Sequence, residues 1–353
     1  MATGDTVLVT GGAGFIGCAL AERLAPTADR WVVLDNLHPQ VHASGQRPDA
    51  LHQSSELVVG DVTDPQTWDD LLCDFRPDIV VHLAAETGTA QSLSEATRHA
   101  QVNVVGTTEM LDAFGRHDHV PGHMVLSSSR AVYGEGAWQK SDGTLFFPGQ
   151  RSHAQLAEGQ WDFPDAASLP SSSIGTLLAP TSIYGATKVA QEHILTAWAG
   201  AHDAALTVLR LQNVYGPGQS LTNSYTGIVS LFSQLARAGK SIPLYEDGSI
   251  VRDFVLIDDV ADAFVAVLQR GPAGRSEPYD IGTGLATTIA ELARSIAAFH
   301  SAPEPHITGQ FRDGDVRAAS CNIAPTLAEL SWKPRFALDE GIARLQEWIE
   351  SQV

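Results

Sequence analysis

The sequence is poor in cysteine, and the few cysteines have no arrangement that suggests a structural role. Cys18, Cys73 and Cys321 lie far apart and are odd in number. A disulfide framework is therefore not indicated, and no two cysteines have the short spacing of a zinc site. This usage favours a protein that folds on a hydrophobic core in a reducing compartment.

Long hydrophobic runs and an excess of basic residues are also missing. No run of about 18 apolar residues occurs, and the N-terminus lacks a basic segment followed by a long apolar one, so neither a transmembrane helix nor a signal peptide is predicted. Lys and Arg number 22 against 41 Asp and Glu, a net charge of −19. Such a surface repels nucleic acid and anionic membranes. We expect a cytoplasmic protein that binds neither, and that must build a local positive field around any anionic substrate.

Apolar segments alternate with helical stretches over the first 210 residues. Strands that are nearly all apolar and alternate with helices predict a parallel sheet covered on both faces. The fold class is therefore α/β, with a doubly wound parallel sheet. The expected strands are residues 6–10, 30–36, 55–64, 78–86, 122–129 and 206–216, and the expected helices include 92–116 and 182–200.

The pattern loosens after residue 211. We interpret the remainder as a smaller lobe over the C-terminal edge of the sheet. The predicted domains are residues 1–210 and 211–353, with some of the chain crossing back to the first domain. Short strands at 242–245, 251–257 and 278–281 and helices at 226–238, 258–269, 287–299 and 338–350 are expected in this lobe.

Residues 135–180 form a long stretch rich in Gly, Ser, Pro and Trp inside the first domain. A connection of this length is usually either functional or disordered. Two interpretations stay open: a flap that covers a substrate, and a surface insertion without a role in the site.

Three glycines follow the first strand and open the first helix. Gly11 allows a tight turn, Gly14 lets the backbone approach a pyrophosphate, and Gly17 permits close packing of the helix. The free N–H groups and the helix dipole can then hold the anion. Asp35 ends the second strand, 18 residues beyond Gly17, where its carboxylate can accept hydrogen bonds from an adenosine ribose and would repel a 2′-phosphate. These residues predict a dinucleotide site that prefers NAD to NADP.

A further acid ends the third expected strand. Asp61 and Val62 are placed to meet the adenine, although an aspartate at this position can equally be a loop or cap residue. His38 and His42 have a spacing that resembles a metal site, but no third ligand is evident. We interpret them as loop residues and expect no metal.

Tyr184 and Lys188 lie four residues apart in a predicted helix, and the lysine is one of only four in the chain. Residues at this spacing share a helix face. A nearby ammonium and a positively charged nicotinamide both favour the phenolate, so Tyr184 can act as a general base. At the end of the fifth strand, Ser129 is the best placed hydroxyl to bind the reacting oxygen, whereas Ser127 and Ser128 can be plain strand-end residues.

At this point the chain resembles the extended short-chain dehydrogenase/reductases that act on sugar nucleotides. The resemblance covers nearly the whole chain. It is carried, in this order, by TGGAGFIG, DN at 35–36, GDV at 60–62, HLAA at 82–85, NVVGT at 103–107, SSSRAVYG at 127–134, YGATK at 184–188, LRLQNVYGP, RDFVLIDDVADA and YDIGTG.

The resemblance implies a Rossmann domain with bound NAD, a C-terminal lobe that holds a nucleoside-diphosphate sugar, and a homodimer formed through the helices at 92–116 and 182–200. It implies Ser129, Tyr184 and Lys188 as the catalytic set. The implied cofactor-binding residues are Gly11, Gly14, Phe15, Ile16, Gly17, Asp35, Asn36, Asp61, Val62, Leu83, Ala84, Ala85, Asn103, Ser127, Tyr184 and Lys188. The implied substrate-binding residues are Thr87, Ser129, Arg130, Asn213, Gln219, Arg252 and Arg317, with the two arginines Arg252 and Arg317 on the diphosphate.

The reaction class is suggested by the residues that follow Ser129. Dehydratases and decarboxylases of this family typically carry an acid there, whereas this chain has Arg130 and Ala131. Segments 34–42, 141–163 and 216–228 are similar to dTDP-L-rhamnose 4-epimerase-type sequences, which share the long insertion. The resemblance therefore favours an NAD-dependent 4-epimerase of a UDP- or dTDP-hexose, acting through a transient 4-keto sugar. A 4-keto reductase, another oxidoreductase, a decarboxylase and a sensor without catalysis remain alternatives.

Overall fold

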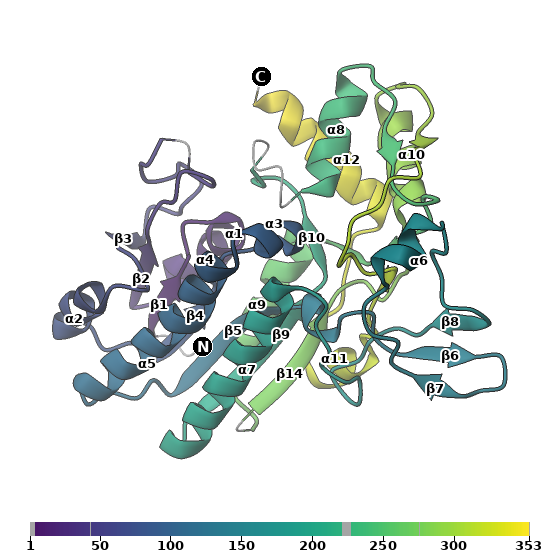
Figure 1. The fold of residues 1–353 in the computed structure, drawn as a ribbon. Coiled ribbons are helices and arrows are strands. Elements are labelled where there is room, and N and C mark those ends of the chain that lie inside the picture. Colours follow the sequence, from purple (N-terminus) through teal and green to yellow (C-terminus); the bar gives the residue numbers. More distant parts are fainter. Residues whose placement is uncertain (1–3, 43, 221–226, 275, 353) are drawn as a thin grey trace.

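A seven-stranded parallel sheet with helices on both faces forms the larger part of the computed structural model (Figure 1). The structure describes residues 4–42, 44–220, 227–274 and 276–352. The expected doubly wound α/β class is confirmed. The strands, in their order across the sheet, are β14 (Ser276–Ile281), β9 (Ala205–Leu211), β5 (His123–Ser129), β4 (Ile79–His82), β1 (Thr6–Thr10), β2 (Arg30–Asp35) and β3 (Ser55–Val59).

The alternation of side chains along each strand supplies two separate cores. Val7 and Val9 of β1 are fully buried in one, while Leu8 is buried in the other. This follows from the two-residue period of a strand. Helices α1 (Phe15–Leu24) and α9 (Ile257–Arg270) cover the first face, and α2 (Pro65–Asp74), α5 (Gly106–Arg116) and α7 (Ile183–His202) cover the second.

Strand β14 and helix α9 follow residue 211 in sequence but pack with the larger domain: β14 pairs with β9 over its whole length, and α9 packs on α1. Some of the chain was expected to cross back to this domain, but the sequence did not indicate which segments. Pro278 and the buried Asp280 interrupt the apolar pattern by which a central strand is recognised. An edge strand tolerates a proline because one side of its backbone needs no partner, and Asp280 is satisfied by the hydroxyl of Tyr133 at 2.8 Å.

The expected helix at 92–116 is broken into α3 (Thr89–Ser94), α4 (Ala96–Ala100), a π-helical turn at Gln101–Val105 and α5. The turn carries Asn103, whose side chain is fully buried. Its amide donates to the Glu86 carbonyl at 3.0 Å and to the Thr187 hydroxyl at 2.9 Å, and its oxygen accepts from the Glu86 N–H at 2.8 Å. The irregular turn therefore ties the loop after β4 to α7.

The C-terminal lobe has a core of its own beside the end of the sheet (Figure 1). Its helices α8 (Ile228–Arg237), α10 (Ile289–Phe299) and α12 (Leu338–Ser351) agree with the predicted positions. Residues 221–226, which include the first residue of the helix expected at 226–238 and part of the segment 216–228 that carries the resemblance, lie outside the described residues. Its shorter elements are β10 (Asn213–Tyr215), β11 (Pro243–Leu244), β12 (Val251–Arg252), β13 (Phe254–Leu256), β15 (Thr287–Thr288), β16 (His306–Ile307), β17 (Ala318–Ala319) and α11 (Ala324–Glu329).

The insertion at 135–180 is folded and lies beside the lobe, below it in Figure 1. Strand β6 (Trp138–Lys140) pairs antiparallel with β7 (Leu145–Phe146) and β8 (Ala166–Ser168), and α6 (His153–Ala157) follows β7. Trp138 packs edge-on against Phe163 at 4.8 Å between ring centroids. The insertion is thus a small module with its own aromatic contacts.

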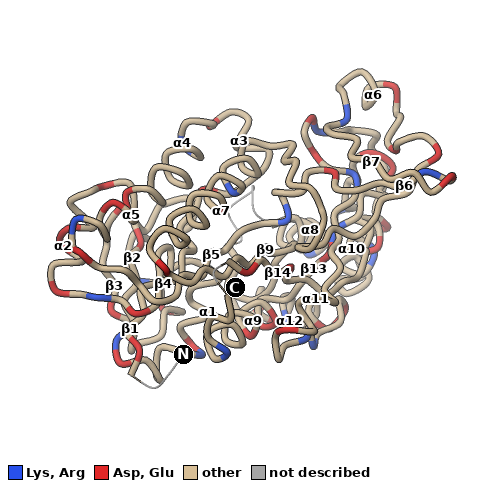
Figure 2. The backbone as a smooth tube through the Cα atoms, turned by 90° about the horizontal axis from the view of Figure 1, so that it is seen from below, with Lys and Arg blue, Asp and Glu red and all other residues tan. Residues whose placement is uncertain are grey.

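The surface is acidic, as the composition requires, with basic residues interspersed along the tube (Figure 2). Within the described ranges, no helix combines the length and the apolarity that crossing a membrane requires. Because acidic residues outnumber basic ones in the whole chain, a positive field for an anionic ligand must come from a local group of basic side chains.

Candidate active site

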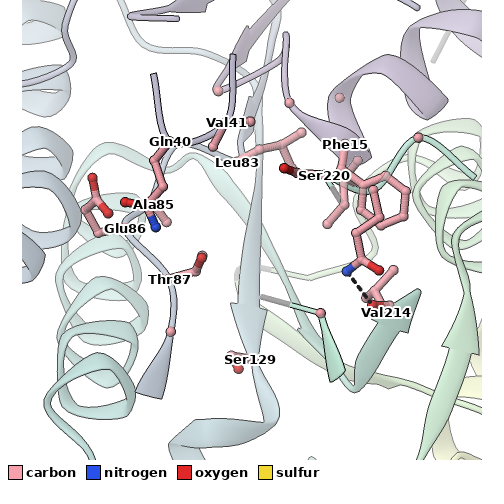
Figure 3. A pocket seen from close by; sticks show the side chains of 18 of the residues that line it. Phe15, Gln40, Val41, Leu83, Ala85, Glu86, Thr87, Ser129, Val214 and Ser220 are labelled. Atoms are coloured by element: carbon pink, nitrogen blue, oxygen red, sulfur yellow. Dashed lines mark hydrogen bonds between the residues drawn. The ribbon is translucent and has the colours of Figure 1, made fainter. Parts of the chain in front are cut away.

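A pocket of about 1050 Å³ opens where the C-terminal ends of the strands face the lobe. Figure 3 shows Phe15 and Val214 on one side, Glu86 and Thr87 on the other, and Ser129 between them, further along the strand. Ligands bind at this edge in doubly wound folds because the chain connections diverge there. Of the described residues between 135 and 180, none lines this pocket, which argues against the substrate-flap interpretation of the insertion.

The turn after β1 has the geometry that an anion cradle needs. Gly11 has φ +66°, and a β-carbon there would lie 2.7 Å from the Ala84 backbone. A β-carbon on Gly17 would lie 2.3 Å from the Gly12 carbonyl oxygen. Both positions therefore require glycine, and α1 begins directly behind the turn. The free N–H groups of its first turn face the pocket.

Asp35 closes the other end of this cradle. Its carboxylate accepts hydrogen bonds from the Ala13 N–H at 3.0 Å and the Leu37 N–H at 2.9 Å. These bonds fix a buried negative charge on the wall of the pocket, with oxygen lone pairs left for a ribose. The turn and this carboxylate fit an NAD dinucleotide, and the charge disfavours a 2′-phosphate.

Most of the residues expected at the site line the pocket. They are Gly11, Gly14, Phe15, Ile16, Gly17, Asp35, Asn36, Val62, Leu83, Ala84, Ala85, Thr87, Ser129, Arg130, Tyr184, Asn213, Gln219 and Arg252. Asp61, Asn103, Ser127, Lys188 and Arg317 do not. Asp61 instead accepts from Asn36 at 3.0 Å and from the Thr63 N–H at 2.9 Å, which is the loop interpretation left open above.

Tyr184, Ser129 and Arg130 meet at the base of the pocket. Burial raises the pKa of Tyr184 above its ordinary value of 10, while a hydrogen bond with Ser129 and the positive charge of Arg130 act in the opposite direction. The Ser129 oxygen also accepts the Ala131 N–H at 3.2 Å. A serine hydroxyl can then still donate its own proton to an oxygen in front of it.

Lys188 has a different environment from the one the sequence suggested. Its ammonium donates to the Ser127 carbonyl at 2.9 Å and to the Gln191 amide oxygen at 2.8 Å. Burial lowers the pKa of Lys188 from 10.5 to about 7, and Glu192 only partly offsets this. In this structure the charge that acts on Tyr184 is that of Arg130. Lys188 lies beneath the end of β5, a position that the four-residue spacing from Tyr184 did not predict.

The arginines that line the pocket include Arg130, directly after β5, and arginines of the lobe. Arg252 lines the pocket, donates to the Val316 carbonyl at 2.9 Å and pairs with Asp315 at 2.6 Å. Arg317 is bound by Asp162, Asp247 and Glu246 and does not line the pocket. Arg312, which the sequence analysis missed, lines the pocket instead and stacks over Tyr245 at 4.8 Å.

Comparison with known proteins identifies the family of this chain. Residues 7–155 and 157–282 match the model of the NAD dependent epimerase/dehydratase family. The chain belongs to this family. Its use of NAD and its place among the nucleotide-sugar enzymes of the short-chain dehydrogenase/reductase type, both expected from the sequence motifs, are confirmed.

Individual members of the NAD dependent epimerase/dehydratase family are similar along the whole chain. A dTDP-L-rhamnose 4-epimerase of Burkholderia thailandensis is 62% identical over 350 residues, which cover 99% of this chain and 96% of the relative. A UDP-glucose 4-epimerase of Mycolicibacterium smegmatis is 32% identical, with 98% of both chains covered. The crystal structure of a UDP-glucose 4-epimerase of Thermotoga maritima with UDP-glucose has a TM-score of 0.81 at 27% identity and covers 98% of this chain and 99% of that one.

Two features of the site were not predicted from the sequence, although Gln212 lies within the LRLQNVYGP motif. Gln212, directly after β9, lines the pocket and is 5% exposed; a polar residue at the end of a parallel strand is the signal that could have found it. His42 lies 3.8 Å from the Asp35 carboxylate. Among the residues that the structure describes, no group of three His, Cys, Asp or Glu side chains is placed to hold a metal ion.

Arg130 is expected to set the pH dependence of the reaction. Its guanidinium is held by Asn213 at 2.7 Å, and burial together with the repulsion of Arg252 lowers its pKa from 12.5 to about 9. Because the charge of Arg130 lowers the pKa of Tyr184, Arg130→Met should raise that pKa and move the acid limb of kcat/KM to higher pH. Arg130→Lys, which keeps the charge, should shift it less. Superimposable pH profiles of the wild type and Arg130→Met would contradict this role.

Proposed function

We propose that this family member inverts C4 of a nucleoside-diphosphate hexose through a transient 4-keto sugar. The single observation that carries the proposal is the meeting of Ser129, Tyr184 and Arg130 in one pocket with the dinucleotide turn. The identity with the dTDP-L-rhamnose 4-epimerase supports dTDP-L-rhamnose as the first substrate to test.

The acids of the pocket support an epimerase rather than a dehydratase. In the described chain, the carboxylates that line it belong to Glu22, Asp35, Glu86 and Asp315. Asp315 is bound to Arg252, Glu86 is bound to Arg98 at 2.7 Å, and Asp35 belongs to the ribose end. Water elimination needs a further acid beside the base, and none of these carboxylates follows Ser129 in the way that the dehydratase pattern requires.

In the proposed mechanism, Tyr184 as phenolate accepts the proton of the 4-hydroxyl, and Ser129 hydrogen-bonds the same oxygen. NAD, which the glycine turn and Asp35 would hold, would supply reversible hydride chemistry at C4. Arg130 stabilises the phenolate, while Arg252 and Arg312 attract the diphosphate. Lys188 is buried beneath this group and holds the end of β5 through the Ser127 carbonyl. The sugar must turn over between the two steps, so its pocket has to be wider than the diphosphate anchor.

The function is tested with dTDP-L-rhamnose, dTDP-glucose, UDP-glucose and UDP-galactose, followed by NMR at C4. We expect inversion at C4 of at least one of them, with no net change in NADH. Net consumption of added NADH would support a reductase instead. Release of carbon dioxide from a UDP-uronate would support a decarboxylase.

The assembly and location belong to the same proposal. Helices α5 and α7 lie side by side on the outer face of the sheet (Figure 1), where their exposed sides can meet those of a second copy. We propose a homodimer through them, in the cytoplasm. Light scattering should give about twice 37.6 kDa, and a mass of a single chain at micromolar concentration would contradict the dimer.

A further inference from the structure

Gln212 stands out among the buried polar side chains of the described chain. Its amide nitrogen and its amide oxygen both lack a hydrogen-bond partner, although the side chain is only 5% exposed. The other buried atoms without partners, on Trp31, Ser55 and Arg270, do not belong to pocket residues, whereas Gln212 lines the pocket. Burying an amide without partners is costly, so a ligand that satisfies both atoms would recover that cost on binding.

The sheet register places Gln212 beside the reaction centre. Leu211, the last residue of β9, pairs with Ser129 at the end of β5, and Gln212 follows directly. The next residue, Asn213, accepts the hydrogen bond from Arg130. In the strand order, β9 lies beyond β5 as seen from β1, which carries the glycine turn. Gln212 therefore lies on the side of Ser129 that faces away from the dinucleotide turn.

The packing around Gln212 holds its stem in place. A β-carbon on Gly282 would lie 2.6 Å from the Gln212 Cγ, so the absence of a side chain there makes room for it. The Gln212 backbone N–H donates to the Ile281 carbonyl at 2.9 Å. A fixed stem with a free amide head is pre-organised to bind, because little side-chain entropy is lost.

We propose that Gln212 is a specificity residue whose amide hydrogen-bonds the hexose ring of the substrate, donating to one hydroxyl and accepting from another. This rests on the proposed function, since it assigns part of the same pocket to the sugar. Carbohydrate hydroxyls suit an amide because each of them both donates and accepts. A site built to bind a hydroxyl discriminates strongly against an analogue that lacks it.

The variant Gln212→Met has nearly the same volume and no hydrogen-bonding head. We expect kcat/KM for dTDP-L-rhamnose to fall about tenfold to a hundredfold. The melting temperature should stay equal or rise, because two unsatisfied polar atoms leave a buried position. Lower activity together with unchanged or higher stability separates a ligand contact from a structural role.

Gln346 is the matched control. It is fully buried in the lobe, and both ends of its amide are satisfied, by Ser233 at 2.7 Å and His300 at 2.9 Å. Gln346→Met should lower the melting temperature and leave KM unchanged. If Gln212→Met instead melts lower, as this control does, with unchanged kcat/KM, the amide serves the fold and the proposal is overturned.

Two further arms identify the ligand. With the 2-deoxy and 3-deoxy analogues of dTDP-L-rhamnose, the penalty of Gln212→Met should shrink for each analogue that lacks a contacted hydroxyl. An equal penalty for every sugar, with loss of bound NAD, would assign the amide to the cofactor and overturn the proposal. Calorimetry with dTDP-L-rhamnose and with dTDP alone measures binding independently of turnover. It therefore distinguishes a failure of the Gln212 contact from a failure of the proposed function. A sugar that is bound through Gln212 but never epimerised would refute the 4-epimerase while leaving the contact intact, and equal binding of both ligands by wild type and variant would refute the contact.

Discussion

Replacing Tyr184 with phenylalanine is expected to lower kcat by about 10²- to 10⁴-fold, the range that a positioned general base contributes. In the proposed mechanism the phenolic oxygen takes the proton from the sugar, and Ser129 beside it cannot replace it because a serine hydroxyl is far less acidic. The ring stays in place, so the NAD site should be unchanged. Turnover measured under saturating dTDP-L-rhamnose, together with the NAD content of the purified protein, checks both statements.

A second tyrosine serves as the control for this experiment. Tyr279 in β14 is also buried, but its hydroxyl donates to Glu329 at 2.7 Å outside the pocket. Tyr279→Phe should therefore leave kcat within a factor of about two, whatever it does to stability. A Tyr184→Phe enzyme that runs at the native rate would show that another group removes the proton.

Replacing Arg151 with methionine is expected to destabilise the protein by about 3 to 5 kcal/mol, the usual cost of leaving buried charges uncompensated. The guanidinium of Arg151 is buried and pairs with Glu246 at 2.8 Å and with Glu135 at 3.2 Å. It also donates to the carbonyls of Trp161 and Asp315, each at 3.0 Å. Its removal leaves two buried carboxylates without this partner, which urea unfolding followed by fluorescence will measure.

The contrast with an exposed pair makes this result specific. Arg344 and Glu340 on α12 pair at 3.3 Å with side chains that are 45% and 53% exposed. Such pairs contribute less than about 1 kcal/mol, so Arg344→Met should hardly change the unfolding free energy. If Arg151→Met loses no more than Arg344→Met, the buried network does not hold the insertion to the lobe.

The Arg151 network also gives the insertion a place in the architecture. Arg151 belongs to the insertion and pairs with Glu246 of the lobe. It also donates to the backbone carbonyl of Asp315, whose carboxylate pairs with the pocket residue Arg252. Burial raises the pKa of Glu135 from 4.5 to about 7, against the influence of Arg151. The sequence showed a stretch rich in Gly, Ser and Pro with no sign of this contact, because an ion pair between residues 95 positions apart leaves no local pattern.

Local sequence patterns were sufficient to predict those features that depend on residues close together in the chain. The glycine turn, Asp35 at a strand end and the alternating apolar strands all follow from steric and burial rules that act within a few residues. They predicted the α/β sheet and the NAD site in advance. The single helix expected at 92–116 failed because the fully buried Asn103 needs a π-helical turn to reach Glu86 and Thr187, and those partners lie far away in sequence.

The sequence by itself determined the fold class, the cofactor and the family, because each rests on short-range sterics and on motifs of fixed spacing. Only the tertiary structure decided which charges act on Tyr184, that Arg312 rather than Arg317 faces the pocket, and that Gln212 keeps an unpartnered amide there. The physical reason is that pKa values and hydrogen-bond satisfaction depend on burial and on groups brought together from distant segments. A sequence gives the identity of those groups but not their neighbours.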